Sequence, residues 1–205
     1  MAIKQKIQKK IELFRKTANL IILFFAFSYY FTGLASILLI LLAFIAVFIP
    51  LDVLYFLTKG KSRFLQLFFK LYPKRQKEYE SILTDASILL LSTFFLVLIF
   101  PKDIAILTMI ILTFADVAEH VFGIKLPWKK LFWNEEKNWS GTLAGFFAAL
   151  TAGILAINFL KLSVPLAFLV PATVVAALAG TLKDHDNLAI AWSVAILLYV
   201  LAALF

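Results

Sequence analysis

The sequence predicts an all-α integral membrane protein, a bundle of about seven transmembrane helices with a cytoplasmic N-terminus. Of the 205 residues, 63% are hydrophobic and only 16% are charged, whereas soluble domains carry about 25% charged residues. The apolar residues form long uncharged runs, and the basic residues lie between them. Because each span needs about 20 residues, seven spans leave no room for a separate soluble domain. We therefore expect residues 1–205 to form one transmembrane domain.

The first 17 residues predict an amphipathic helix on the membrane surface. Ile3, Ile7, Ile11 and Phe14 recur at helical spacing opposite a lysine-rich face, which is typical of an interfacial helix. The uncharged run that follows, 17–51, is far longer than the apolar region of a signal peptide. We expect no cleavage there.

The breaks between the uncharged runs divide the chain into spans. Interfacial aromatics and a turn glycine at 29–33 split the first run into two, and Pro101 ends the third span. The expected spans are 18–31, 34–50, 82–100, 104–118, 140–160, 164–182 and 188–205.

The net charge of +8 mainly reflects the orientation of the chain in the membrane. Of the 20 basic residues, 18 lie in the N-terminus and in 51–81, 116–141 and 183–187, and only Lys102 and Lys161 lie in the alternate connections. By the positive-inside rule this places the N-terminus in the cytoplasm of a multi-pass protein in a cell membrane or an endoplasmic-reticulum-type membrane. The basic residues form no face of their own, so membrane lipids rather than nucleic acid are the expected partners. With no cysteine, thiolate catalysis and Cys-ligated zinc are excluded.

Three polar clusters on the predicted cytoplasmic side could carry chemistry. In the first, Asp116, Glu119 and His120 share one helical face if the fourth helix continues past its apolar run. Carboxylates so close to hydrocarbon are costly unless they are paired or bind a cation, and Mg²⁺ suits one or two carboxylates plus phosphates. The alternative is a helix end that reaches the headgroups.

The second cluster, 137–142, opens the fifth span. The free N–H groups of a helix start bind phosphate, and Lys137 adds a full charge. The alternative is ordinary capping by Asn138 or Ser140 with a snorkelling lysine, and with Gly141, Gly145 and Gly153 used for close helix packing.

The third cluster, 183–187, links the last two spans. Asp184 and Asp186 beside Asn187 can hold a cation in a tight turn, or they are solvated turn residues. Asp85, at the start of the third span on the same side, either joins these clusters or caps its helix.

The order of these clusters resembles the CTP-dependent lipid kinases, a family that includes dolichol, phytol and farnesol kinases and the CTP-dependent diacylglycerol kinase. Their motif Glu-Leu-x-Arg-Lys-x-x-His is similar to residues 12–19, with Asn19 in place of the histidine. Their Gly-Asp…Gly-Arg is similar to 115–125, with Ala115 for the first glycine and Lys125 for the arginine. Their Lys-Ser-x-x-Gly-Ser and Asp-Asp-Asn-Leu elements are similar to 137–142 and 185–188.

The resemblance implies transfer of the terminal phosphoryl group of CTP to the hydroxyl of a polyprenol or isoprenoid alcohol of the dolichol type, with Mg²⁺ as cofactor. The alternatives are a CTP-dependent diacylglycerol kinase and a CDP-lipid synthase similar to phosphatidate cytidylyltransferases. The closing signature of those transferases, Gly-His-Gly-Gly-x-x-Asp-Arg-x-Asp, is absent, which favours a kinase. A transporter or assembly factor is a third reading, disfavoured because the runs 86–101, 138–160 and 187–205 carry no charge.

The kinase hypothesis assigns roles to residues of the three polar clusters and of the N-terminal motif. The metal candidates are Asp116, Glu119 and Asp186. The candidates for guiding the acceptor proton are Asp116, Asp184 and His120, with His185 as a further option. The candidates for binding nucleotide and phosphate are Lys137, Ser140, Gly141, Thr142, Arg15, Lys16, Lys125 and Asn187. Arg15 and Lys16 equally suit anionic lipid or topology alone.

Overall fold

The structure is a computed structural model that describes residues 20–58, 82–126, 128–182 and 186–205. These residues form helices and no strand, apart from one isolated bridge between Lys130 and Asn138. The elements are α2 (Ile21–Thr32), α3 (Leu34–Thr58), α5 (Asp85–Ile99), α6 (Lys102–Lys125), α7 (Trp139–Leu160), the 3-10 turn η2 (Leu166–Phe168), α8 (Leu169–Gly180) and α9 (Asp186–Leu204). The all-helical prediction is confirmed for this part of the chain. The amphipathic helix expected at 1–17 lies outside it.

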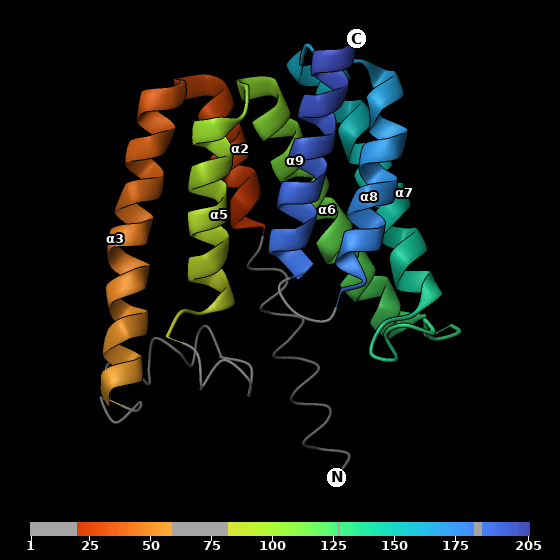
Figure 1. Cartoon of the computed structure of the whole chain (residues 1–205), viewed down its shortest axis with the longest axis horizontal. Helices are drawn as coiled ribbons and strands as arrows, with labels where there is room; N and C mark the ends of the chain where they lie inside the picture. Colours follow the sequence, from red (N-terminus) through yellow and green to blue (C-terminus); the bar gives the residue numbers. More distant parts are fainter. Residues whose placement is uncertain (1–19, 59–81, 127, 183–185) are drawn as a thin grey trace.

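Successive helices run in alternating directions (Figure 1). The starts of α5, α7 and α9 therefore lie at the same end of the bundle as the ends of α3, α6 and α8. We call this end, marked by Asp85, Lys125, Trp139 and Asp186, the motif end. Lys102 and Lys161 lie at the opposite end, where α6 begins and α7 stops.

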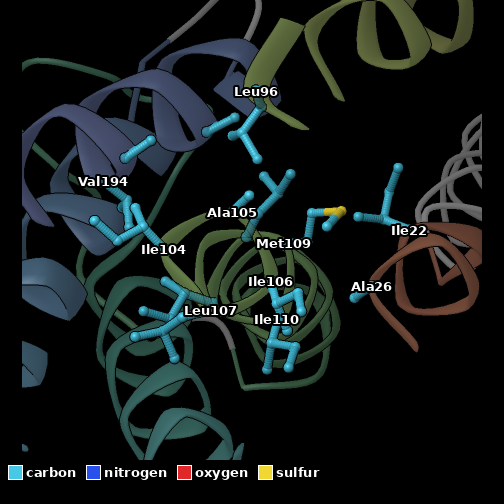
Figure 2. Packing of buried hydrophobic residues seen from close by; sticks show 14 of the residues in the cluster. Ile22, Ala26, Leu96, Ile104, Ala105, Ile106, Leu107, Met109, Ile110 and Val194 are labelled. Carbon is cyan, nitrogen blue, oxygen red and sulfur yellow. The ribbon is translucent and has the colours of Figure 1, made fainter. Parts of the chain in front are cut away.

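Helix α6 is the centre of the bundle. Of its most apolar stretch 72% is buried, against 11% for α3, because α6 packs against α2, α5, α7, α8 and α9. Figure 2 shows the α6 side chains packing against residues of α2, α5 and α9. The residues labelled there are Ile22, Ala26, Leu96, Ile104, Ala105, Ile106, Leu107, Met109, Ile110 and Val194.

The end of the bundle opposite the motif end is held by two polar contacts of α6. Lys102 Nζ donates to the carbonyl oxygen of Tyr30 at 2.9 Å. The Asp103 carboxylate accepts from the Ser163 N–H at 2.7 Å. These contacts join the start of α6 to α2 and to the connection between α7 and α8.

Four of the helices, α3, α6, α7 and α9, are long and apolar enough to cross a membrane. The stretches Ile21–Thr32, Asp85–Ile99 and Leu166–Gly180 are apolar but shorter. All seven lie where a span is expected.

Two helices extend further than the expected spans. Helix α3 continues through Pro50 to Thr58, beyond the expected span of 34–50 and beyond the uncharged run that ends at Leu51. Helix α6 continues past 118 to Lys125, so Asp116, Glu119 and His120 all belong to one continuous helix. In both cases a buried carboxylate finds polar partners on another element, which allows the helix to continue.

Candidate functional site

The ammonium group of Lys137 joins three elements at the motif end. Its Nζ lies 3.0 Å from Glu119 Oε1 on α6 and 3.3 Å from Asp186 Oδ2 on α9. It also donates to the carbonyl oxygen of Gly180 at the end of α8, at 2.8 Å. Asp116 lies close enough to interact electrostatically with both Lys137 and Glu119. We call Asp116, Glu119, Lys137 and Asp186 the charge cluster.

Asp116 and Glu119, the two residues of the charge cluster on α6, are both buried. Asp116 and Glu119 are three residues apart and share the face of α6 that looks toward α7 and α8; their exposed fractions are 2% and 4%. Glycines on those helices make room for them. A β-carbon on Gly145 would lie 3.3 Å from Glu119 Cβ, and one on Gly180 would collide with Glu119 Oε2.

Lys137 reaches the cluster from an ordered connection between α6 and α7. The Leu131 N–H donates to the Lys137 carbonyl and the Lys137 N–H donates to the Asn134 carbonyl, both at 3.1 Å. Asn134 Nδ2 in turn donates to the Thr181 carbonyl just after α8, at 2.8 Å. The connection is thereby fixed to the end of α8, and the Lys137 backbone is held before its side chain enters the cluster.

Lys137 is a cation that lies among carboxylates. Burial alone would lower its pKa, but the nearby carboxylates of Glu119 and Asp186 outweigh burial, and the pKa is raised above its ordinary value. The side chain is therefore an ammonium ion at any physiological pH. Among the described residues, three carboxyl groups, those of Asp116, Glu119 and Asp186, interact electrostatically with this ammonium.

The start of α7 is capped by its own side chains. Asn138 Oδ1 accepts from the Gly141 N–H at 2.9 Å and from the Ser140 hydroxyl at 2.7 Å, while Asn138 Nδ2 donates to the Gly123 carbonyl at 2.8 Å. The Thr142 hydroxyl donates to the Asn138 carbonyl at 3.3 Å. The capping alternative is thus observed for Asn138. Phosphate binding by Ser140, Gly141 and Thr142 stays a prediction.

The packing alternative for the α7 glycines is also observed. A β-carbon on Gly141 would lie 2.6 Å from the Glu119 carbonyl oxygen, and one on Gly153 would lie 2.7 Å from a Leu169 methyl. Gly145 similarly faces the Ala115 carbonyl at 3.0 Å. At Gly141 the obstacle is backbone and leaves no room for a larger residue, while at Gly145 and Gly153 the neighbouring atoms would have to shift. The glycines thus let α7 approach α6 and α8.

A small cavity lies beside the cluster. Asp85 at the start of α5 lines it together with Asp186 and Asn187 at the start of α9, and its volume is about 10 Å³. A cavity of this size is at the lower limit for one water molecule. Asp85 therefore joins the third cluster, one of the two possibilities that its position in the sequence left open.

The donor set fits Mg²⁺ only with outside ligands. Within the residues that the structure describes, no three His, Asp or Glu side chains are gathered so that they could hold one ion. Glu119 also has its Oε1 paired with an ammonium and its Oε2 against Gly180. Mg²⁺ is commonly held by one or two carboxylates plus phosphates and waters, and Asp186 with Asp85 or Asp116 meets that smaller requirement.

The other predicted residues are more dispersed. His120 is half-buried on α6 with its Nε2 screened from solvent, and Lys125 is exposed at the last turn of α6. The Asn187 N–H donates to Asp186 Oδ1 at 3.0 Å. Arg15, Lys16, Asp184 and His185 lie outside the described residues.

Sequence reasoning missed Asp52, a buried carboxylate near the end of α3. Its Oδ2 accepts from the Thr84 N–H and hydroxyl, both at 2.8 Å, and from the Ser87 hydroxyl at 2.6 Å. This carboxylate fixes α3 to the start of α5, next to Asp85. The available signal was an isolated acid after a long charge-free run, followed on the same side by Thr84 and Ser87.

No protein-family model, curated protein or solved structure matches this chain.

Proposed function

We propose that the protein is a multi-pass membrane kinase that transfers the terminal phosphoryl group of CTP to the hydroxyl of a polyprenol or isoprenoid alcohol. The proposal rests on the resemblance of four sequence elements to CTP-dependent lipid kinases. The observation that carries it is the Lys137 ammonium, which lies between Glu119 and Asp186. Three of those elements, far apart in the sequence, contribute to this one cluster.

The chemistry of phosphoryl transfer matches the kinds of group gathered here. The acceptor oxygen bonds to the γ-phosphorus while the bond to the β–γ bridging oxygen breaks, and CDP leaves with that electron pair. Such a reaction requires mainly positioning and neutralisation of charge. Lys137 supplies a permanent cation, and Asp116, Asp184 and His120 are candidates to take the hydroxyl proton.

Mg²⁺ would neutralise charge on the CTP phosphates. Asp186, with Asp116 or Asp85, would hold it, and the nucleotide phosphates would complete its ligands. Without such an ion, the carboxylates of the charge cluster would repel the nucleotide. Lys137 and the start of α7 would then bind phosphate oxygens.

A seven-span topology with the motif end in the cytoplasm gives both substrates access. Asp116 lies 14 residues after Lys102 on α6, about 21 Å along the helix at 1.5 Å per residue. If Lys102 lies at the outer boundary of a hydrocarbon layer about 30 Å thick, Asp116 lies inside that layer, near its cytoplasmic boundary. A lipid alcohol can reach that depth from within the bilayer, while CTP approaches from the cytoplasm.

The topology can be tested because the chain has no cysteine. In intact cells or sealed vesicles, Lys102→Cys is expected to react with a membrane-impermeant maleimide from outside only. Glu136→Cys, at the exposed connection between α6 and α7, is expected to react from the cytoplasmic side only. Labelling of both from one side would refute this arrangement.

The reaction can be tested with detergent-purified protein, Mg²⁺ and γ-labelled CTP, offered geranylgeraniol, dolichol or diacylglycerol separately. We expect label in an isoprenoid alcohol and release of CDP. Label only in diacylglycerol would keep the reaction but change the acceptor. Release of pyrophosphate with a phosphatidate acceptor would identify a CDP-lipid synthase instead.

A further inference from the structure

The connection between α6 and α7 exposes an unusual amount of aromatic surface. Phe132 is 87% exposed and Trp128 is 66% exposed, and Trp133 and Trp139 are also exposed. The four side chains lie within twelve residues of chain. Aromatic residues that a globular protein leaves in water at this density mark a binding surface. Trp128, Phe132, Trp133 and Trp139 are called the aromatic loop below.

The aromatic loop is ordered by its own contacts. The Trp139 N–H donates to the Lys129 carbonyl at 3.1 Å, and Trp133 Nε1 donates to the Thr181 hydroxyl at 3.0 Å. The rings of Phe132 and Trp133 meet edge to face at 4.4 Å between centroids, and those of Trp133 and Trp139 at 5.8 Å. The loop therefore presents Phe132 and Trp128 outward on a fixed frame.

The length of α6 gives the depth of this loop. The helix has 24 residues, about 36 Å at 1.5 Å per residue. The hydrocarbon layer is about 30 Å thick and a bilayer with its headgroups about 40–45 Å. Lys102 at the other end lies at the outer boundary in the proposed topology. The residues after Lys125 then lie at the level of the cytoplasmic headgroups, where Trp and other aromatic rings are favoured.

Charge favours an anionic lipid surface. Lys129 and Lys130 are exposed beside Trp128, and Lys125 is exposed at the end of α6. Basic residues next to aromatic ones attract anionic headgroups. The apolar surface also continues onto α6, where Phe122 and Leu126 are exposed.

We propose that the aromatic loop inserts Phe132 and Trp128 into the headgroup region of a bilayer that contains anionic phospholipid, with Lys129 and Lys130 on the phosphates. The loop ends at Lys137, so its insertion would hold the segment that supplies the cation of the charge cluster. This inference rests on the chain crossing the membrane and is independent of the reaction proposed above.

The test uses two single-cysteine proteins, Phe132→Cys and Glu135→Cys, each labelled with an environment-sensitive fluorophore in lipid nanodiscs. Glu135 is exposed on the same loop and is the matched control. We expect headgroup-level nitroxide lipids to quench the label at 132 about threefold more than the label at 135, and aqueous iodide to show the reverse order. Phosphatidylglycerol should increase the lipid quenching at 132 relative to phosphatidylcholine alone, and Lys129→Ala with Lys130→Ala should remove that increase.

Equal iodide quenching at 132 and 135, without lipid quenching at either, would overturn the proposal. Protection of the label at 132 by CTP but not by lipid would also overturn it and identify a surface that stacks on the nucleotide base. If Phe132→Cys fails to fold, brominated lipids and the tryptophan fluorescence of the unlabelled protein replace it. Brominated lipids should then quench less fluorescence in Trp128→Phe, and an unchanged quenched fraction would contradict insertion.

Discussion

Gly180 at the end of α8 lies directly against the carboxylate of Glu119 on α6, leaving no space for a β-carbon. The restriction is one of space, because the backbone of Gly180 is not left-handed. The carbonyl oxygen of Gly180 also accepts a hydrogen bond from the Lys137 ammonium. One position thus controls both partners of the Glu119–Lys137 ion pair.

Gly180→Ala is expected to displace the Glu119 carboxylate and weaken its pairing with Lys137. We expect a lower melting temperature and loss of most of the proposed kinase activity. The matched control is Gly123→Ala, where the nearest atom would be 3.5 Å away and alanine favours the helix by up to about 1 kcal/mol. Glu119→Asp shortens the side chain and should partly restore Gly180→Ala. Equal stability of the two alanine variants would contradict the observed contact.

Lys137→Met removes the cation from between Glu119 and Asp186. Because Glu119 is 4% exposed, an unpaired charge there is costly, and we expect a loss of about 3 kcal/mol in the free energy of unfolding. Lys125→Met, at an exposed lysine, should cost almost nothing. Thermal unfolding in detergent measures both. Adding Glu119→Gln to Lys137→Met should recover part of the loss, and additivity of the two changes would mean that they do not interact.

The pH dependence of the Lys137 contribution follows from its raised pKa. The unfolded value is near 10.5, and a pKa raised in the folded state gives stability that is complete below the unfolded value. It is lost as the pH rises through the folded value. The stability difference between the native protein and Lys137→Met should therefore stay constant from about pH 8 to 10 and shrink above that. A decline already at pH 8 would show that Lys137 is not held as an ammonium.

Asp52→Ala should loosen the attachment of α3 to α5. It removes three hydrogen bonds from Thr84 and Ser87, and bonds to a charged group are worth about 1.5–3 kcal/mol each before losses overlap. We expect a loss of roughly 3 kcal/mol. Asp52→Asn, which keeps an acceptor, should lose less. Urea unfolding of both variants would measure this, and a native-like Asp52→Ala would contradict the assigned contacts.

The sequence was sufficient for the helices and for the polar end, but not for the pairing within it. Hydropathy and the alternation of Lys and Arg identified each helix, and the spacing of Asp116 and Glu119 predicted their shared face. The ion pairs of Lys137 with Glu119 and Asp186 join residues far apart in the chain, so only tertiary packing brings them together. Gly180 contacts another helix, so the sequence around it does not indicate this contact.

The ends of two helices show the same limit. The uncharged run ends at Leu51, and the second span is therefore expected to stop at residue 50. In the structure the Asp52 carboxylate is bound by Thr84 and Ser87 on α5, and α3 continues to Thr58. Such a long-range polar contact leaves no pattern along one helix.

We propose that the charge cluster is the site of phosphoryl transfer from CTP. Asp116→Asn is to be compared with Asp103→Asn in the γ-labelled CTP assay, with whichever of the offered alcohols the native protein labels. Both changes replace a carboxylate on α6 by an amide, one in the cluster and one at the opposite end. We predict that Asp116→Asn loses at least about 100-fold in turnover while Asp103→Asn stays near the native rate. Full turnover by a correctly folded Asp116→Asn protein would show that the charge cluster is not the site of the reaction.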